Sequence, residues 1–160
     1  VVDIHRSRAE IYQAMLAQVG IRVKIRTWPN SGALKDAWWQ AKKLPVEQQR
    51  DAILNDWGNS SLDPYDILIP KFHSDPYGLG RGNYSGYANP EVDRLLESTL
   101  QATSDEERRD AFMRVQEIIY HDVPMVFEFV PHEIYGVNRR VKNFRPSPDS
   151  RMHLIDVDVE

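Results

Sequence analysis

Cysteine is absent from this 160-residue chain, which excludes disulfides and thiolate metal sites and leaves the cellular compartment open. Long hydrophobic runs are absent too, because no apolar stretch approaches the roughly 18 residues that a membrane-spanning helix needs. The opening stretch VVDIHRSRAE contains neither an initiator Met nor the architecture of a signal peptide. We therefore expect the chain to be a piece of a longer protein, with any export signal upstream.

The sequence also lacks the short motifs that bind nucleotides or build common active sites. GxGxxG, Walker and GxSxG patterns are missing, and the glycine-rich stretch GLGRGNYSG has no strong strand before it and no lysine at its end. No HxH or HxxxH spacing occurs among the five histidines, His5, His73, His121, His132 and His153. These absences predict no catalytic residues, no metal site built from this chain alone and no cofactor.

Charge is nearly balanced along the chain. The formal net charge is -4, and the 20 Lys and Arg are intermixed with the 24 Asp and Glu. Such a surface is typical of a solvated globular protein and gives no reason to expect a nucleic-acid partner. A chain of this length with 41% apolar residues can bury the core of one globular domain.

Periodicity and capping signals predict an α/β fold, a mixed sheet with flanking helices. Helices are expected at 7–19, at 33–43, after Asp63–Pro64, after Asn89–Pro90 and after Ser104. Strands are expected at 1–4, 21–28, 52–57, 125–130, 133–137 and 152–160. Gly20 would end the first helix and lead into a βαβ unit, whereas the last strand has no obvious partner in the sequence. Residues 73–87 should form an ordered, glycine-rich loop.

The two helices after Asn89–Pro90 and Ser104 each carry an apolar stripe at helical spacing. The stripes are Val92, Leu95, Leu96 and Thr99, and then Ala111, Phe112, Val115, Ile118 and Ile119. We interpret both stripes as core.

Four stretches together resemble the extracellular solute-binding proteins of ABC importers, in the group that binds dipeptides, oligopeptides and nickel. NYSGYANPEVDRLLEST resembles the family segment Tyr-x-Asn-Pro-x-(Val/Phe)-Asp-x-Leu-(Leu/Ile), and SDEERRDAFMRVQEIIYHDVPMVFEF resembles the helix, turn and strand that follow it. YQAMLAQVGIRVKIRTW is similar to a helix-Gly-Ile-strand unit, and DWGNSSLDPYD to a Trp-containing loop before an Asp-Pro helix. The matching residues of the first two stretches are Tyr87, Asn89, Pro90, Val92, Asp93, Leu95, Leu96, Asp105, Glu106, Arg108 and Pro124.

The resemblance runs through nearly the whole chain and implies a periplasmic-binding-protein-like second lobe. In this family two lobes enclose the ligand between them. Residues 1–144 would then form a single ligand-binding lobe of a larger two-lobe protein. Residues 145–160 would form a segment that returns toward the first lobe, which this chain lacks.

The resemblance also implies that the loop after Trp57 faces the cleft between the lobes. Small residues there would let backbone groups reach an extended ligand, and the indole would supply apolar contact and one donor. The implied ligand-binding residues are Trp57, Gly58, Asn59, Ser60, Ser61 and Asp63. The alternative interpretation is that Trp57 only caps the core and that the residues after it form a tight start to a helix.

One departure from the family pattern leaves the ligand open. Peptide-binding members often have an Asp three residues after this Trp, where it pairs with the ligand α-amine, but here the position is Ser60. A hydroxyl cannot supply that charge-assisted bond. Asp56, Asp63 or the other lobe would have to replace it, or the ligand is not a free-amine peptide.

The function that the resemblance implies is non-enzymatic. The protein would be the substrate-binding component of an ABC importer, located in the periplasm or outside the cell, which captures a peptide or peptide-like solute. Its partner would be a membrane permease, and it would meet the membrane only through that permease or through an upstream lipid anchor.

Three alternatives stay open. His73 lies near the position of a histidine in nickel-binding members, although it is not in register with it. A small α/β hydrolase or transferase could use Asp63, Asp66 and His73. A stand-alone interaction domain could use the loop at 77–87 as its surface.

Overall fold

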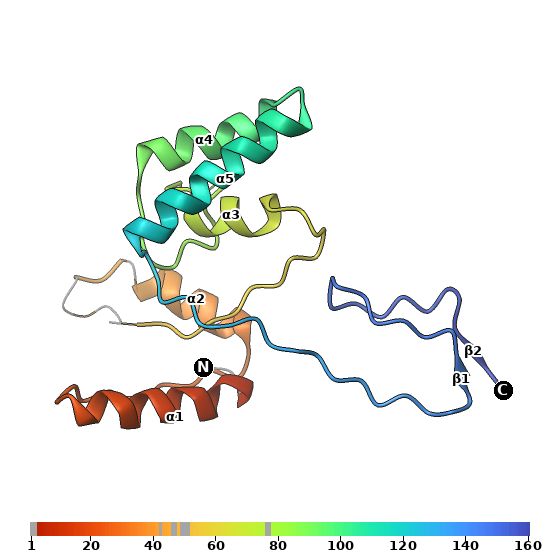
Figure 1. Ribbon diagram of the computed structural model, residues 1–160. Helices are drawn as coiled ribbons and strands as arrows, with labels where there is room; N and C mark the ends of the chain where they lie inside the picture. The colour runs from red at the N-terminus through yellow and green to blue at the C-terminus, as the bar shows by residue number, and fades with distance from the viewer. Residues whose placement is uncertain (1–2, 42, 46–47, 49–51, 76–77) are drawn as a thin grey trace. The chain divides into compact units, whose positions relative to one another are not determined.

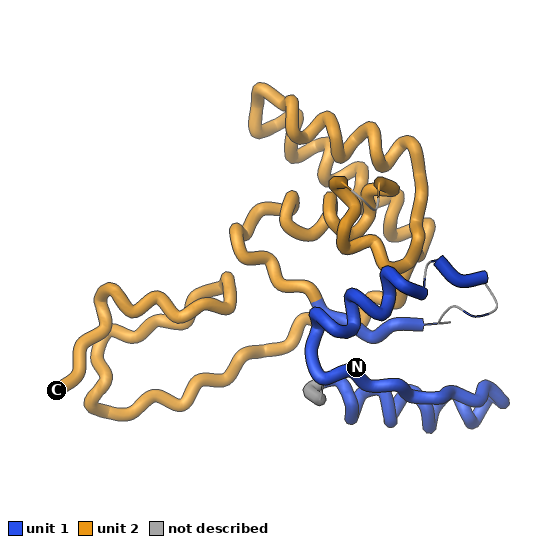
Figure 2. The backbone as a smooth tube through the Cα atoms, turned by 180° about the vertical axis from the view of Figure 1, so that it is seen from behind, with its two compact units in different colours: residues 1–56 blue, residues 57–160 orange. Residues whose placement is uncertain are grey.

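The computed structural model of the protein describes residues 3–41, 43–45, 48, 52–75 and 78–160. The chain divides into two compact units, Val1–Asp56 and Trp57–Glu160 (Figure 2). Among the described residues, no helix has the length and apolar character needed to cross a membrane.

The described part of unit 1 contains the helices α1 at Asp3–Gln18 and α2 at Ser31–Ala41 (Figure 1). Asn30 caps α2, because its Oδ1 accepts a hydrogen bond from the backbone N–H of Ala33 at 2.9 Å. Both predicted helices are confirmed, with boundaries shifted by a few residues.

Gly20 ends α1 as predicted. Its φ of +83° lies in the left-handed region, and its amide donates to the carbonyl of Ala17 at 3.1 Å. The next amide, that of Ile21, donates to the carbonyl of Leu16 at 3.0 Å. These two bonds form a Schellman motif, which satisfies carbonyls at the end of the helix and favours glycine at this position.

Over its described residues, unit 2 contains three helices and a two-stranded ladder. The helices are α3 at Tyr65–Phe72, α4 at Pro90–Gln101 and α5 at Asp105–Asp122. The strands β1 at Val141–Lys142 and β2 at Asp158–Val159 pair antiparallel. α4 and α5 lie side by side, and α3 packs against them (Figure 1).

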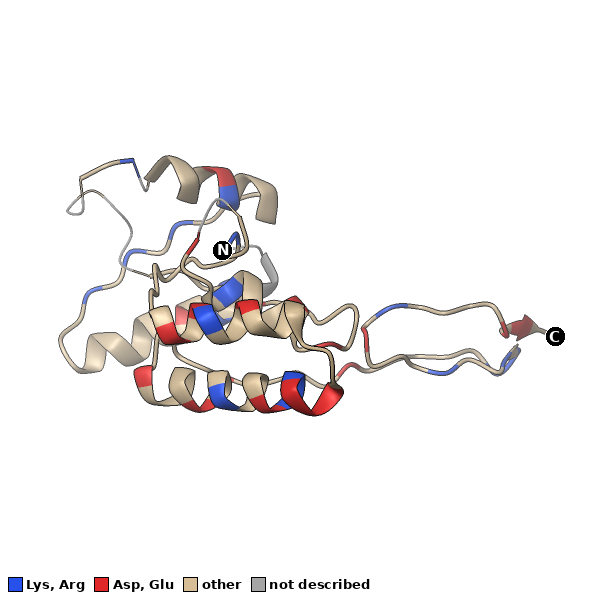
Figure 3. Cartoon of the chain, turned by 90° about the horizontal axis from the view of Figure 1, so that it is seen from above, with Lys and Arg blue, Asp and Glu red and all other residues tan. Residues whose placement is uncertain are grey.

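Short polar side chains set the starts of α4 and α5, as their capping signals predict. The Oδ1 of Asn89 accepts from the N–H of Glu91 at 3.0 Å, and the Oγ of Ser104 accepts from the N–H of Glu107 at 3.2 Å. Acidic residues occupy the first turn of each helix, where the helix dipole favours them. Figure 3 shows acidic and basic residues interspersed along both helices.

The core of unit 2 lies between these three helices, and both predicted stripes contribute to it. The buried residues are Leu68, Ile69, Phe72, Val92, Leu96, Phe112, Val115 and Ile119. Leu95 and Ile118 pack against this cluster in a partly buried position, and Thr99 is also buried. Periodicity therefore identified the inner faces of α4 and α5 correctly.

The predicted mixed sheet is mostly not formed in the described residues. The following predicted ranges contain no strand: 21–28, 52–57, 125–130 and 133–137. Two apolar side chains of these segments lie almost fully in solvent, since Val130 is 90% exposed and Ile134 is 94% exposed. A strand is stable only beside hydrogen-bonding neighbours, so the alternating pattern alone does not produce one.

The two terminal strand predictions also need correction. Within 152–160 only β2 forms a strand. The expectation that this strand has no partner is wrong, because β2 pairs with β1. Ile4, predicted near the end of a strand, belongs to α1 instead, and Val1 and Val2 lie outside the described residues. An apolar run of that length is too short to outweigh the helical pattern that follows it.

The core assignment predicts different effects for two leucines on α4. Leu96 is fully buried, whereas Leu100 is 49% exposed. Leu96→Ala should lower the free energy of unfolding by about 2 to 5 kcal/mol, because it leaves a cavity, and Leu100→Ala by less than about 1 kcal/mol. Urea denaturation followed by circular dichroism measures both. Equal losses for the two variants would contradict the assigned core.

Candidate functional site

Asp66, in the first turn of α3, organises the loop that begins at Trp57. Its backbone carbonyl accepts a hydrogen bond from the indole Nε1 of Trp57 at 2.7 Å. Its Oδ2 accepts from the backbone N–H of Ser61 at 2.9 Å and from the Oγ of Ser60 at 3.3 Å. Hydrogen bonds from the side chain and backbone of Ser61 lower the pKa of this carboxyl. One residue thus fixes the start and the middle of the loop.

The carbonyl of Asp66 can accept from the indole because of Pro70, which lies inside α3. In a regular helix each carbonyl accepts from the N–H four residues later. Proline has no N–H, so the carbonyl of Asp66 loses its helical donor. The indole N–H of Trp57 supplies the hydrogen bond in its place.

The indole ring of Trp57 is also held from the side. The Nζ of Lys71 lies 4.6 Å from the centre of this ring and 4.9 Å from that of Tyr84, which are cation–π distances. Gly82 lies close to the ring, because a Cβ there would come within 3.0 Å of two indole carbons. Trp57 nevertheless remains 41% exposed. The indole is therefore fixed in orientation and still presents surface to solvent.

Asp63 forms an ion pair across the unit to α5. Its two oxygens accept from Arg108, at 2.6 Å from Nη1 and 2.9 Å from Nη2. Its Oδ1 also accepts from the backbone N–H of Tyr65 at 2.8 Å. The predicted N-cap role of Asp63 is wrong, because α3 begins at Tyr65 and Pro64 occupies the N-cap position without a side-chain cap. The Arg108 hydrogen bond lowers the pKa of Asp63. A ligand amine at Asp63 would have to share the carboxylate with Arg108.

The remaining loop residues leave polar and backbone groups available. The side-chain Oδ1 of Asn59 is buried and has no hydrogen-bond partner in the described residues. A Cβ at Gly58 would meet no atom within 4 Å, so the space beside it is open. Leu62 has a φ of 60°, a left-handed conformation that is uncommon outside glycine and clusters at functional sites.

The other polar residues named by the sequence lie in separate contacts. His73 is buried, its Nδ1 accepts from the N–H of Asp75 at 3.1 Å, and its Nε2 lies 3.2 Å from Glu97. Among the described residues, no group of three or more His, Asp or Glu side chains is arranged to hold a metal. Within the described part of the chain, no hydrogen bond or ion pair joins His73 to Asp63 or Asp66.

The glycine-rich loop is ordered over its described part, residues 78–87. The Nδ2 of Asn83 donates to the carbonyl of His73 at 3.1 Å and to that of Tyr87 at 2.7 Å. A Cβ at Gly80 would lie 1.9 Å from the carbonyl oxygen of His73, so this position requires glycine. Tyr77, in the predicted interaction surface, lies outside the described residues.

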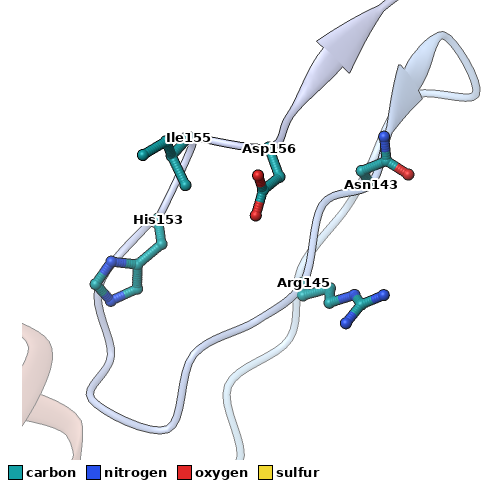
Figure 4. A pocket seen from close by; sticks show the side chains of 5 residues that line it. All are labelled: Asn143, Arg145, His153, Ile155 and Asp156. Atoms are coloured by element: carbon teal, nitrogen blue, oxygen red, sulfur yellow. The ribbon is translucent and has the colours of Figure 1, made fainter.

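An open pocket of about 280 Å³ occurs elsewhere in unit 2, between the segment that follows β1 and the segment that leads to β2 (Figure 4). Its lining residues are Asn143, Arg145, His153, Ile155 and Asp156. No residue of the Trp57 loop lines this pocket.

Comparison with known proteins shows which family the chain resembles. No protein-family model matches it. The chain is 30% identical over 136 residues to the probable D,D-dipeptide-binding periplasmic protein DdpA of Escherichia coli, covering 85% of this chain and 25% of that protein. It is 24% identical over 152 residues to the probable di/tripeptide-binding protein 5 of Pseudomonas aeruginosa, covering 95% and 27%. The chain belongs to the family 5 extracellular solute-binding proteins.

The fold agrees with a solved structure, that of HbpA2 from Haemophilus parasuis. The TM-score is 0.67 at 22% identity, and the match covers 97% of this chain and 29% of that chain. The chain thus spans about a quarter of the length of its solute-binding relatives. Both relatives are named as binding proteins.

Four residues around the indole were not predicted from the sequence: Pro70, Lys71, Gly82 and Tyr84. Only Pro70 carries a local signal, because it stands four residues after Asp66 within a predicted helix. Gly82 and Tyr84 come near the indole only because the glycine-rich loop folds back, whereas Lys71 reaches it from α3. Their sequence separation from the loop gave no indication of this.

The Asp63–Arg108 pair predicts a pH-dependent contribution to stability. Because the folded pKa of Asp63 is lowered, the pair stabilises the fold above the unfolded pKa, near 3.8, and the contribution is lost as pH falls through the folded value. Asp63→Asn should therefore be less stable than the wild type at pH 7. The difference should shrink steadily below about pH 4. Urea midpoints measured from pH 7 to pH 2 check this, and a difference that stays constant over this range would contradict the ion pair.

Proposed function

We propose that this chain forms part of the substrate-binding component of an ABC importer, which captures a peptide or peptide-like solute between two lobes. The observation that carries the proposal is 30% identity to a protein named as D,D-dipeptide-binding, over 85% of this chain. A second peptide-binding relative matches 95% of it. The protein would act in the periplasm or outside the cell, with a membrane permease as its partner. Closure of the lobes around the ligand would be the signal that the permease reads.

The ligand would contact the Trp57 loop, through the candidate residues Trp57, Gly58, Asn59, Ser60, Ser61 and Asp63. Three features of the loop support this. The indole is 41% exposed yet fixed in orientation, so little freedom is lost on binding. The buried Oδ1 of Asn59 lacks a donor that a ligand amide could supply. Open space beside Gly58 leaves its backbone accessible.

The geometry narrows the role of the individual groups. Because the indole N–H of Trp57 already bonds Asp66, the ring would contribute apolar contact and no donor. Both oxygens of Asp63 accept from Arg108, and the hydroxyl of Ser60 faces Asp66. The loop therefore offers a ligand apolar surface and amide acceptors, but no free carboxylate. These groups suit the N–H groups of a peptide backbone better than an isolated α-amine.

The proposed fold of the whole protein completes the sheet. Segments 125–130 and 133–137 would become strands of a mixed sheet, since apolar residues on both faces of 125–130 are typical of a strand covered on both sides. Phe127 and Phe129 are 55% and 61% exposed, and Val126 is 84% exposed. Residues 1–144 would belong to one lobe and 145–160 to the segment returning toward the other lobe.

Hydrogen exchange tests the sheet. In the full-length protein, amides of 126–130 should exchange at least about a hundredfold more slowly than in the 160-residue chain, because strand pairing protects them. Amides of α4 serve as the internal reference, since that helix is already formed in this chain. Equally fast exchange of 126–130 in both proteins would contradict the proposed strands.

Binding by the full-length protein tests the function. Calorimetry with D-alanyl-D-alanine, dialanine, trialanine and Ni²⁺ should give binding of at least one of the three peptides. In that case Trp57→Ala should weaken it about tenfold to a hundredfold, because a large apolar contact is lost. Tyr120→Ala is the matched control, since this tyrosine is 73% exposed in the same unit and lies outside the loop.

Two results would count against the proposal. Binding of Ni²⁺ without any peptide would favour the nickel-binding alternative. Peptide binding that Trp57→Ala and Tyr120→Ala leave equally strong would show that the ligand does not use this loop.

A further inference from the structure

We propose that Pro70 is a positioning residue for the ligand. Because proline has no backbone N–H, Pro70 leaves the carbonyl of Asp66 to accept from the indole of Trp57, and this hydrogen bond orients the ring. The inference rests on the proposed function, because it concerns how the indole of Trp57 is presented. Pro70 does not belong to the loop and is not among the candidate ligand contacts. Its effect would pass through the backbone carbonyl of Asp66.

Pro70 occupies a position that is unusual for proline. Pro70 lies within α3, where proline is unfavourable by about 3 kcal/mol or more in a regular helix interior. It follows Asp66 by four residues, so the one carbonyl that it deprives of a helical donor is that of Asp66. A carbonyl that has lost its helical donor needs another hydrogen-bond donor, and this one accepts from a side chain of the loop.

The side chain of Trp57 replaces the helical donor that the carbonyl of Asp66 lacks. The indole Nε1 of Trp57 donates to this carbonyl at 2.7 Å, a short and therefore well-formed bond. Tryptophan has only one donor, so the bond determines which edge of the indole points to α3. The exposed remainder of the ring is then the part that a ligand can reach.

The carbonyl of Pro70 also holds Gly82, the glycine that lies beside the indole. It accepts from the backbone N–H of Gly82 at 2.7 Å. Gly82 in turn lies so close to the indole that a Cβ would come within 3.0 Å of it. Pro70 thus joins two of the groups that hold the ring, one through a missing donor and one through its own acceptor.

The proposal separates ligand binding from stability. Pro70→Ala restores an N–H that competes with the indole for the carbonyl of Asp66, and it removes the ring that opposes a regular helix. The thermal midpoint should therefore stay the same or rise, while affinity for the peptide identified by calorimetry should fall about threefold to tenfold. A residue with a merely structural role would lower the midpoint or leave affinity unchanged.

The indole N–H provides a readout that needs no ligand. In ¹⁵N-tryptophan-labelled full-length protein, Trp57→Phe identifies the indole signal of Trp57. In Pro70→Ala this signal should exchange with water at least about threefold faster than in the wild type, because its hydrogen bond is weakened. Pro90→Ala is the matched control. Pro90 stands at the first position of α4, where no earlier helical carbonyl depends on it, so neither the signal nor affinity should change.

A double-mutant cycle completes the test. Trp57→Phe keeps an aromatic ring and removes the donor, so adding Pro70→Ala to it should cause no further loss of affinity. A full additional loss in that background, or an unchanged indole signal in Pro70→Ala, would overturn the inference. If no peptide binds, or if Trp57→Ala leaves affinity unchanged, the proposed function fails, and the indole signal still decides whether Pro70 orients Trp57.

Discussion

The hydrogen bond from the indole of Trp57 to the backbone carbonyl of Asp66 holds the loop at the start of unit 2 in place. The same aspartate accepts from the backbone of Ser61 through its carboxylate, so its main chain and side chain anchor two points of the loop. Arg108 adds a third anchor from α5 by pairing with Asp63. The conformation of the loop therefore depends on α3 and α5, which in turn depend on the packed core of unit 2.

In the proposed binding mode, the loop would bind a ligand without first becoming ordered. Ordering side chains and backbone on binding costs free energy, and a loop that is already fixed avoids much of that cost. Trp57 combines a fixed edge with a ring face that remains open to solvent. The buried acceptor of Asn59 adds a polar group that lacks a donor in the described residues. An apolar ring and an amide acceptor are groups that suit the alternating side chains and N–H groups of a peptide.

The features that could be predicted from the sequence are those set by interactions between residues close together in the sequence. The caps at Asn89 and Ser104 and the glycine at Gly20 act over a few residues, and all three behave as predicted. The buried stripes of α4 and α5 are also local patterns, because helical periodicity alone determines which side chains share a face.

The strands depend on partners far away in the sequence, and periodicity carries no information about those partners. Val130 and Ile134 illustrate this, since they lie in segments whose composition is typical of strands and yet remain almost fully exposed. In the candidate site, the loop after Trp57 and the helix that follows it could be predicted, whereas the strand predicted to end at Trp57 is not formed. The hydrogen bond from the indole N–H to Asp66 and the ion pair between Asp63 and Arg108 could not be predicted. Both depend on the three-dimensional path of the chain.

The most direct test of the account is a crystal structure of the full-length protein with a bound peptide. The account predicts peptide atoms within about 4 Å of the exposed face of the Trp57 ring, with the indole N–H still bonded to Asp66. A peptide bound elsewhere, with the Trp57 ring left in solvent, would contradict it.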